Sequence, residues 1–356
     1  MLKLRRGVVV EADPLTVELG GGERRRAWSD PGLIGACEPG DEVLVNVEAL
    51  DLNLGSGGFD IVCANLTRGL GAERAGEIHV MKLNYSPLQH PVDPVEAGHD
   101  EAPPRPGRTP PVLVVPLHGH LAPVAWAFAE VAAGLGLGYV QTPGAALPGT
   151  LSRDVASLRD RGLLAGHVTA GPCYGGEYEA ISVPGALHAA AERLGWDAIV
   201  AGPGPGILGS ATRYGHGGMA ALDSAHAALA LGLPTLLSPR LSASDPRDRH
   251  RGLSHHSAAV LELLLAPVRV PVPETDAGGW PTGAPEGGSA LDALAAVTEA
   301  CGGRHDVAVE PIDLDGYAAA GLPTRSMGRA IDEDPLFFAA PLAAGRALAH
   351  AVRESG

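Results

Sequence analysis

The feature that most constrains this chain is a proline-rich stretch, residues 86–111, that separates two different hydrophobic patterns. Eight prolines fall in this stretch, and apolar residues are scarce in it. Proline-rich segments of this kind act as semi-rigid spacers between folded parts of a chain. The sequence therefore predicts one domain at residues 1–85, a linker at 86–111 and a second domain at 112–356.

Residues 1–85 carry short strand-like runs, which are separated by turn dipeptides such as Asp13-Pro14 and Pro39-Gly40. About five such runs fit into this length, and the stretch has no helical periodicity. Evenly spaced short strands with glycine and proline at the turns are typical of small barrels. We expect a small β-barrel of the OB or SH3-like kind.

From residue 112 onward, apolar strand-like runs alternate with helical patterns. Residues 112–117 are continuously apolar, as in a strand that is buried on both faces, and residues 123–133 have a helical pattern. This alternation continues to the C-terminus, interrupted by a loop at 273–289. It predicts a three-layer α/β domain with a mainly parallel, Rossmann-like sheet.

Charge and cysteine usage exclude several classes of protein. The chain has 26 Lys and Arg against 41 Asp and Glu, a net charge of −15, which opposes nucleic acid or an anionic membrane as the main partner. The four cysteines form no CxxC pair, which argues against a cysteine zinc site. No signal-peptide core follows the N-terminus, so we expect a cytoplasmic protein. A basic cluster on the predicted barrel is a weak indication of nucleic-acid binding: Lys3, Arg5, Arg6, Arg24, Arg25 and Arg26.

Polar residues follow several predicted strands, and open α/β sheets bind ligands beyond the carboxyl ends of their strands. His118 and His120 come directly after the strand at 112–117. On an extended segment, a His-x-His pair points both rings to one side, which makes the two histidines candidate metal ligands and candidate catalytic groups. The alternative is that both imidazoles hydrogen-bond to loop carbonyls.

A glycine-rich segment follows the strand predicted at 197–201. Gly202, Gly204 and Gly206 would let the backbone approach an anion, and Arg213 would add charge. Prolines separate these glycines, so the segment is not a dinucleotide-binding fingerprint, and a tight crossover to the next helix remains the alternative. His216 lies just before that helix and is a further candidate catalytic residue.

The densest polar run of this domain spans residues 240–256. Arg249, Arg251 and His256 are candidate ligand-binding residues there, and His255 is a candidate catalytic residue. Neighbouring helical residues point about 100° apart, so we expect only one of the two histidines to face the site. The alternative is a solvated surface loop. A second polar loop at 324–329 has two arginines that could reach the same edge.

Glu177 is the remaining candidate, as an acid/base group or a metal carboxylate. Acidic residues near helix starts are also common for electrostatic reasons alone.

The chain as a whole resembles an uncharacterised bacterial family, domain of unknown function family 3866. The resemblance rests on residues 6–14, 114–123, 144–164, 202–218, 245–256 and 325–338. It implies no activity, cofactor or catalytic residue.

Three functions agree with these features, and the sequence does not decide whether the protein is an enzyme. The first is an enzyme or binding protein for a small anionic ligand, such as a phosphorylated one, held by the glycines and arginines. The second is a hydrolase whose divalent metal is held by His118 and His120, joined by His216, His255 or Glu177. The third is a regulatory or assembly protein. Its alanine- and glycine-rich helices would suit homodimer packing.

Overall fold

The computed structural model describes residues 1–54, 57–71, 80–97, 109–274 and 290–355. The chain forms two compact units, Met1–Val92 and Asp93–Gly356. The division lies inside the proline-rich stretch at 86–111, of which residues 98–108 fall outside the described residues. Most of the loop predicted at 273–289 also falls outside them.

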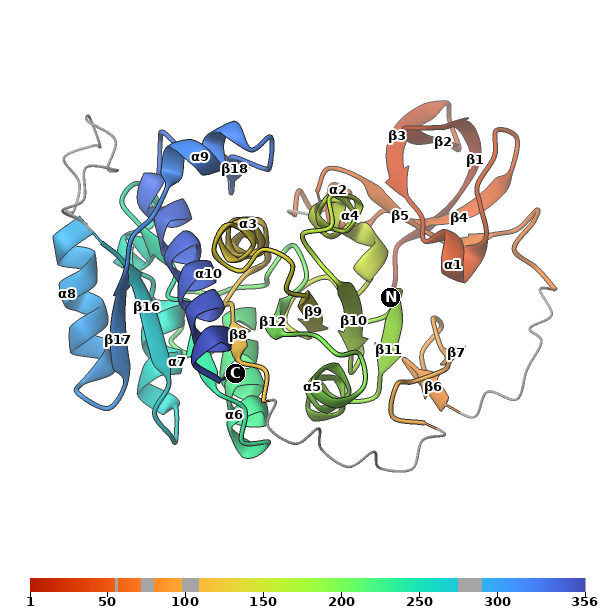
Figure 1. Ribbon diagram of the computed structural model, residues 1–356. Coiled ribbons are helices and arrows are strands. Elements are labelled where there is room, and N and C mark those ends of the chain that lie inside the picture. Colours follow the sequence, from red (N-terminus) through yellow and green to blue (C-terminus); the bar gives the residue numbers. More distant parts are fainter. Residues whose placement is uncertain (55–56, 72–79, 98–108, 275–289, 356) are drawn as a thin grey trace. The chain divides into compact units, whose positions relative to one another are not determined.

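The first unit contains a closed five-stranded barrel, which confirms the prediction of a small β-barrel (Figure 1). Its core is built almost entirely from valine, with Val9, Val17 and Val43 fully buried. The order around the barrel is β1-β2-β3-β5-β4, and the strands are β1 (Leu4–Ala12), β2 (Leu15–Leu19), β3 (Glu23–Trp28), β4 (Glu42–Asn46) and β5 (Asp60–Asn65).

Two short helices and a hairpin complete the first unit: α1 (Pro31–Ile34), α2 (Glu48–Asp51), β6 (Val80–Lys82) and β7 (His90–Val92). The hairpin shows that the predicted linker begins later than residue 86. Most of the basic cluster is engaged in ion pairs with acidic residues of the same unit, as Arg25 with Asp51 and Arg24 with Glu18. These pairs weaken the case for a nucleic-acid surface on the barrel.

The second unit is built on an eight-stranded sheet in which every strand pair is parallel, as predicted. The strand order is β11-β10-β9-β12-β8-β13-β16-β17. In chain order the strands are β8 (Val112–Val114), β9 (Leu137–Thr142), β10 (Gly166–Ala170), β11 (Tyr178–Ala180), β12 (Ala198–Pro203), β13 (Thr235–Leu237), β16 (Arg269–Pro273) and β17 (Asp306–Glu310).

Helices cover both faces of this sheet, which gives the predicted three layers (Figure 1). The alternation of side chains along a strand sorts them between two cores. Val112 and Val114 of β8 pack in one core, whereas Leu113 packs in the other. The first core takes residues from α5 (Val183–Glu192), α6 (Ala220–Ala230), α7 (His255–Leu263) and α8 (Ala290–Cys301). The second takes residues from α3 (Leu121–Val131), α4 (Arg153–Asp160) and α9 (Leu314–Ala319).

The last helix, α10 (Pro335–Ser355), packs along α3 and β16. Within the described residues it alone is long and apolar enough, by length and composition, to cross a membrane. However, 83% of its apolar window is buried inside the unit. Burial of this extent is typical of a core helix, and length and composition alone do not distinguish a core helix from a membrane span.

Candidate functional site

A cavity of about 490 Å³ lies in the second unit at the carboxyl edge of the sheet. We call it the edge cavity. Its wall combines the segments that follow β8 and β12 with the polar run after β13 and the loop before α10. The lining residues are Leu117, His118, Gly119, Asp154, Gly204, Pro205, Gly206, Ile207, Gly209, Ser210, Arg240, Arg247, Arg249, His250, His256, Arg325, Ser326 and Met327.

The edge cavity brings together five of the predicted site residues. They come from three segments that are distant in sequence, as expected for strand ends that meet at one edge: His118, Gly204, Gly206, Arg249 and His256. Two further candidates, His216 and His255, lie behind the wall, where their rings contact the ring of His256. Arg325 of the loop predicted to reach this edge also lines the cavity.

Four predicted residues are engaged elsewhere and do not line the cavity. Glu177 forms an ion pair with Arg159, and Arg213 forms one with Glu262. Arg251 pairs with Asp248 at 3.2 Å. Gly202 lies inside β12, where a Cβ would come within 2.3 Å of Val115 Cγ2, so packing inside the sheet requires this glycine.

The prediction that His118 and His120 share one side of an extended segment is wrong. Pro116 offers no N–H to the sheet, and residues His118–His120 form a 3₁₀ helix. At three residues per turn, the two rings point to different surroundings. His118 Nε2 lies 2.7 Å from Ser152 Oγ, whereas His120 Nδ1 lies 3.0 Å from Ser238 Oγ. They do not form a metal-binding pair.

His118 is one of the titratable side chains that line the edge cavity. It is 8% exposed, and its Nε2 lies 3.9 Å from Asp154 Oδ2. Burial lowers its pKa, and the charge of Asp154 partly opposes that effect. Ser152 also caps α4 by accepting a hydrogen bond from the Val155 N–H.

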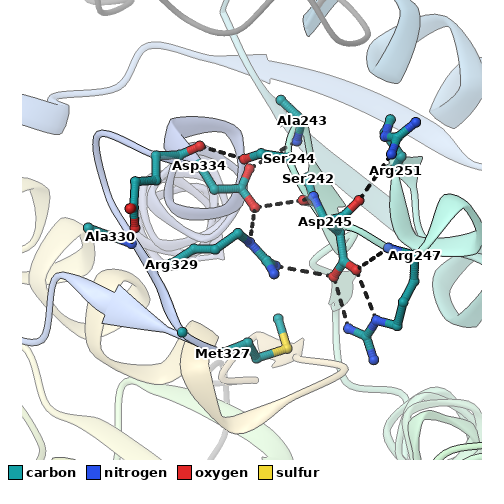
Figure 2. A network of polar contacts seen from close by, with 12 residues as sticks. Ser242, Ala243, Ser244, Asp245, Arg247, Arg251, Met327, Arg329, Ala330 and Asp334 are labelled. Atoms are coloured by element: carbon teal, nitrogen blue, oxygen red, sulfur yellow. Dashed lines mark hydrogen bonds and ion pairs between the residues drawn. The ribbon is translucent and has the colours of Figure 1, made fainter.

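A buried network of arginines and aspartates supports the part of the wall that includes Arg247 (Figure 2). Asp245 is fully buried and pairs with Arg240, Arg247 and Arg329 at 2.9–3.1 Å. Arg329 also donates to Asp334, whose other oxygen accepts from the Ala243 N–H. Three guanidinium groups therefore share two carboxylates.

Electrostatics keep this network charged. Burial opposes ionisation of Asp245, but hydrogen bonds and the charges of Arg247 and Arg329 outweigh burial and hold its pKa well below the usual range. Burial lowers the pKa of Arg240 to about 10, which still leaves it protonated at neutral pH. Arg240 is 1% exposed, and its Nε has no hydrogen-bond partner in the described part of the chain.

Three histidines meet beside the cavity, and we call them the histidine cluster: His216, His255 and His256. One ring nitrogen from each lies within 4.8 Å of the other two. The rings of His216 and His256 stack at 3.6 Å between centroids. Burial lowers the pKa of all three, that of His256 to about 2, so the rings are neutral.

The chain forms this cluster by folding the glycine-rich segment back on itself. Gly209 pairs with His216, and the Gly217 N–H donates to the Leu208 carbonyl. His255 and His256 open α7, whose N-cap is Ser254. Of the two, only His256 lines the edge cavity, in agreement with the expectation that one of them faces the site, although both rings belong to the histidine cluster.

Sequence reasoning missed the residues that hold the arginines in place. The polar run at 240–256 includes Arg240, Asp245 and Arg247, but its composition is equally typical of a solvated loop. The order Asp245-Pro246-Arg247 after a buried strand was the available sign, because an Asp before such a turn caps backbone N–H groups. Asp245 does accept from the Arg247 N–H at 3.0 Å.

These features describe a protein made of a small β-barrel and a parallel α/β unit with an arginine-lined cavity at its sheet edge. A model of the family described as "Protein of unknown function (DUF3866)" matches residues 26–345. The chain therefore belongs to this family, as its sequence motifs predicted. No curated protein and no solved structure gives a significant match.

Proposed function

We propose that the edge cavity binds a small anionic ligand with a phosphate or carboxylate group. The observation that carries this proposal is the charge of the wall. Arg240, Arg247, Arg249 and Arg325 line the cavity, and Asp154 is the one acidic residue among the lining residues. Asp245 already pairs with Arg240 and Arg247, and Glu333 lies 3.6 Å from Arg325, so the unpaired charge of the wall comes from Arg249.

Arg249 is the arginine best suited to contact a ligand. It is exposed on the cavity wall and makes no hydrogen bond or ion pair within the described residues. Arg247 is different, because two of its nitrogens are already bound to Asp245. A guanidinium without a partner presents up to five donors to an anion. The backbone of Gly204 and Gly206 lines the same space.

Glycine at position 204 allows the backbone at the cavity wall to pack closely against its neighbours. A Cβ there would come within 2.5 Å of the Ala146 carbonyl oxygen and 2.7 Å of Gln141 Nε2. Only glycine lets the segment after β12 lie this close to its neighbour. That close approach keeps the space in front of His118 open for a ligand.

The test is calorimetric titration of untagged protein at low ionic strength with inorganic phosphate and, separately, with succinate. We expect one site per chain and an affinity that falls with added salt. Arg249→Gln should weaken binding about tenfold or more, since one charge-assisted hydrogen bond contributes about 1.5–3 kcal/mol. Within the described residues the variant loses no hydrogen bond or ion pair, so its fold should be unchanged.

Arg251→Gln is the matched control. Arg251 lies two residues away, is also exposed and does not line the cavity; it pairs with Asp248, and its Nη2 lies 3.5 Å from the Asp245 carbonyl oxygen. It should change the affinity less than twofold. The proposal is overturned if neither probe binds, or if Arg249→Gln and Arg251→Gln weaken binding equally.

A further inference from the structure

We propose that His216, His255 and His256 form a binding site for a divalent transition metal ion of the zinc class. The site would take three imidazole ligands from the protein and leave one position open at the wall of the edge cavity. This inference goes beyond anion binding and rests on histidines instead of the arginines of the wall, so either proposal can fail without the other.

The first support is convergence. The three ligand nitrogens lie within 4.8 Å of one another, although His216 comes from a loop and His255 and His256 come from the start of α7. A zinc ion holds imidazole nitrogens at about 2.0–2.1 Å, so tetrahedral ligands lie about 3.4 Å apart. The rings of His216 and His256 lie nearly parallel, with 11° between their planes, so metal binding requires side-chain rotations that unstack them and turn their in-plane lone pairs toward one ion.

The second support is that these nitrogens lack partners. His216 Nδ1, His255 Nε2 and His256 Nε2 are buried and accept no hydrogen bond in the described part of the chain. His216 and His256 are only 7% and 4% exposed. A buried polar atom without a partner destabilises a fold, and such atoms in native proteins call for an explanation. A metal ion bound by the three rings would explain why the cluster holds three such atoms.

The third support is the orientation of His216. Its Nε2 lies 2.9 Å from the Arg213 carbonyl oxygen. A carbonyl can only accept, so the proton is on Nε2 and the lone pair is on Nδ1, the buried atom that has no hydrogen-bond partner in the described part of the chain. Metal-binding histidines almost always donate their second ring N–H to such an outer partner. Arg213, predicted as an anion ligand, contributes here through its backbone.

The donor set selects the class of metal. Imidazole nitrogen suits zinc, copper, nickel and cobalt, whereas magnesium and calcium require oxygen ligands. Three protein ligands with one open position are the arrangement of catalytic rather than structural zinc sites. Because His256 belongs to both the cluster and the cavity wall, an ion there would reach a ligand in the cavity.

Neighbouring arginines define the conditions of binding. Arg240 and Arg249 act on His255 electrostatically and oppose a bare dication. An anion in the edge cavity would offset their charge. Binding free energies are reciprocal, so phosphate should tighten metal binding by the same factor as metal tightens phosphate binding.

The experiment is equilibrium dialysis of untagged, chelator-stripped protein against zinc, followed by elemental analysis. We expect one zinc per chain. His255→Gln and His256→Gln should each weaken binding at least tenfold, since even loss of an outer-shell partner costs 10–100-fold. His255 is partly exposed, so its variant needs less repacking than that of His256.

His188→Gln is the matched control, because His188 is an exposed histidine on α5. It should leave zinc binding unchanged. Cobalt(II) provides a second readout on the wild-type chain, since tetrahedral cobalt bound to imidazole absorbs visible light strongly and hydrated octahedral cobalt does not. The proposal is overturned if zinc binding is no stronger than in the cluster variants, if His118→Gln abolishes it instead, or if bound cobalt remains octahedral.

Discussion

Replacement of Asp245 by asparagine tests whether the buried carboxylate holds the arginine wall in place. The side chain is fully buried and is the acidic partner of three guanidinium groups. Asparagine keeps the shape but removes the charge. Arg240, which is 1% exposed and has no other ion-pair partner in the described residues, would then be a buried cation without a counter-charge.

Removing one partner of a buried ion pair destabilises a protein by about 3–5 kcal/mol. Because the asparagine oxygen still accepts one hydrogen bond, we expect a loss of about 3 kcal/mol in the free energy of unfolding. For a unit of this size, that loss lowers the melting temperature by roughly 6–10 °C.

The assay is urea denaturation followed by far-UV circular dichroism, in which the long helices of the α/β unit dominate. The midpoint should fall while the slope stays constant. Asp248→Asn is the matched control, because Asp248 lies in the same loop, is 93% exposed and pairs only with Arg251. It should change stability by less than about 0.5 kcal/mol.

Acid titration separates charge from packing. The pKa of Asp245 is lower in the folded than in the unfolded state. Its ionised form therefore adds to the free energy of unfolding above the ordinary pKa of 3.8, and this contribution is lost as the pH falls below that value. The difference between wild type and Asp245→Asn should therefore narrow below about pH 4. A loss below 1 kcal/mol at neutral pH, or a difference independent of pH, would refute the reasoning.

Two further predictions concern the sheet. Gly138→Ala should destabilise the α/β unit by about 3 kcal/mol, because its Cβ would fall 1.7 Å from Trp196 Cε3. In the same denaturation assay Gly136→Ala, which meets only ordinary contacts, should cost less than about 1 kcal/mol. Burial, His118 and Arg159 lower the pKa of His167 to about 3. As pH falls, His167 is therefore protonated first in the unfolded chain. Between pH 7 and pH 5 the free energy of unfolding of the wild type should fall by about 2 kcal/mol more than that of His167→Gln. Equal pH profiles of the two proteins would contradict this prediction.

The fold was largely predictable because its two units follow regular periodicities. The buried strands of the α/β unit appear in the sequence as apolar runs, and the apolar run at 112–117 contains β8 (Val112–Val114). Ser152 and Ser254 begin their helices as their capping chemistry predicts. Boundaries differ where one residue changes backbone bonding, as Pro116 does after β8.

The position of the candidate cavity at the sheet edge was predictable from the sequence, but the side chains that line it were only partly predictable. The rule that ligands bind beyond strand ends led to five residues of the cavity wall, among them His118, Gly204 and Arg249. It could not separate Arg249 from Arg251, since that distinction depends on which way a short 3₁₀ turn presents each side chain. Spacing also favoured His118 and His120 over His216, because the back-folding of Gly209 onto His216 leaves no periodic pattern in the sequence.

The buried charges of the α/β unit are difficult to explain by stability alone. Well-packed apolar residues in place of a buried ion pair are often neutral or stabilising, so Asp245 and Arg240 add little that valine and leucine would not. We infer that these buried charges serve to preorganise the arginine side chains. A guanidinium fixed by a carboxylate before a ligand arrives loses less side-chain entropy when it binds, and that cost otherwise subtracts from affinity. Arg247, bound to Asp245 through two nitrogens, is preorganised in this sense, whereas Arg249 is not. If the cavity binds an anion, Arg247 should therefore contribute mainly orientation, and Arg249 should supply the contact that forms on binding.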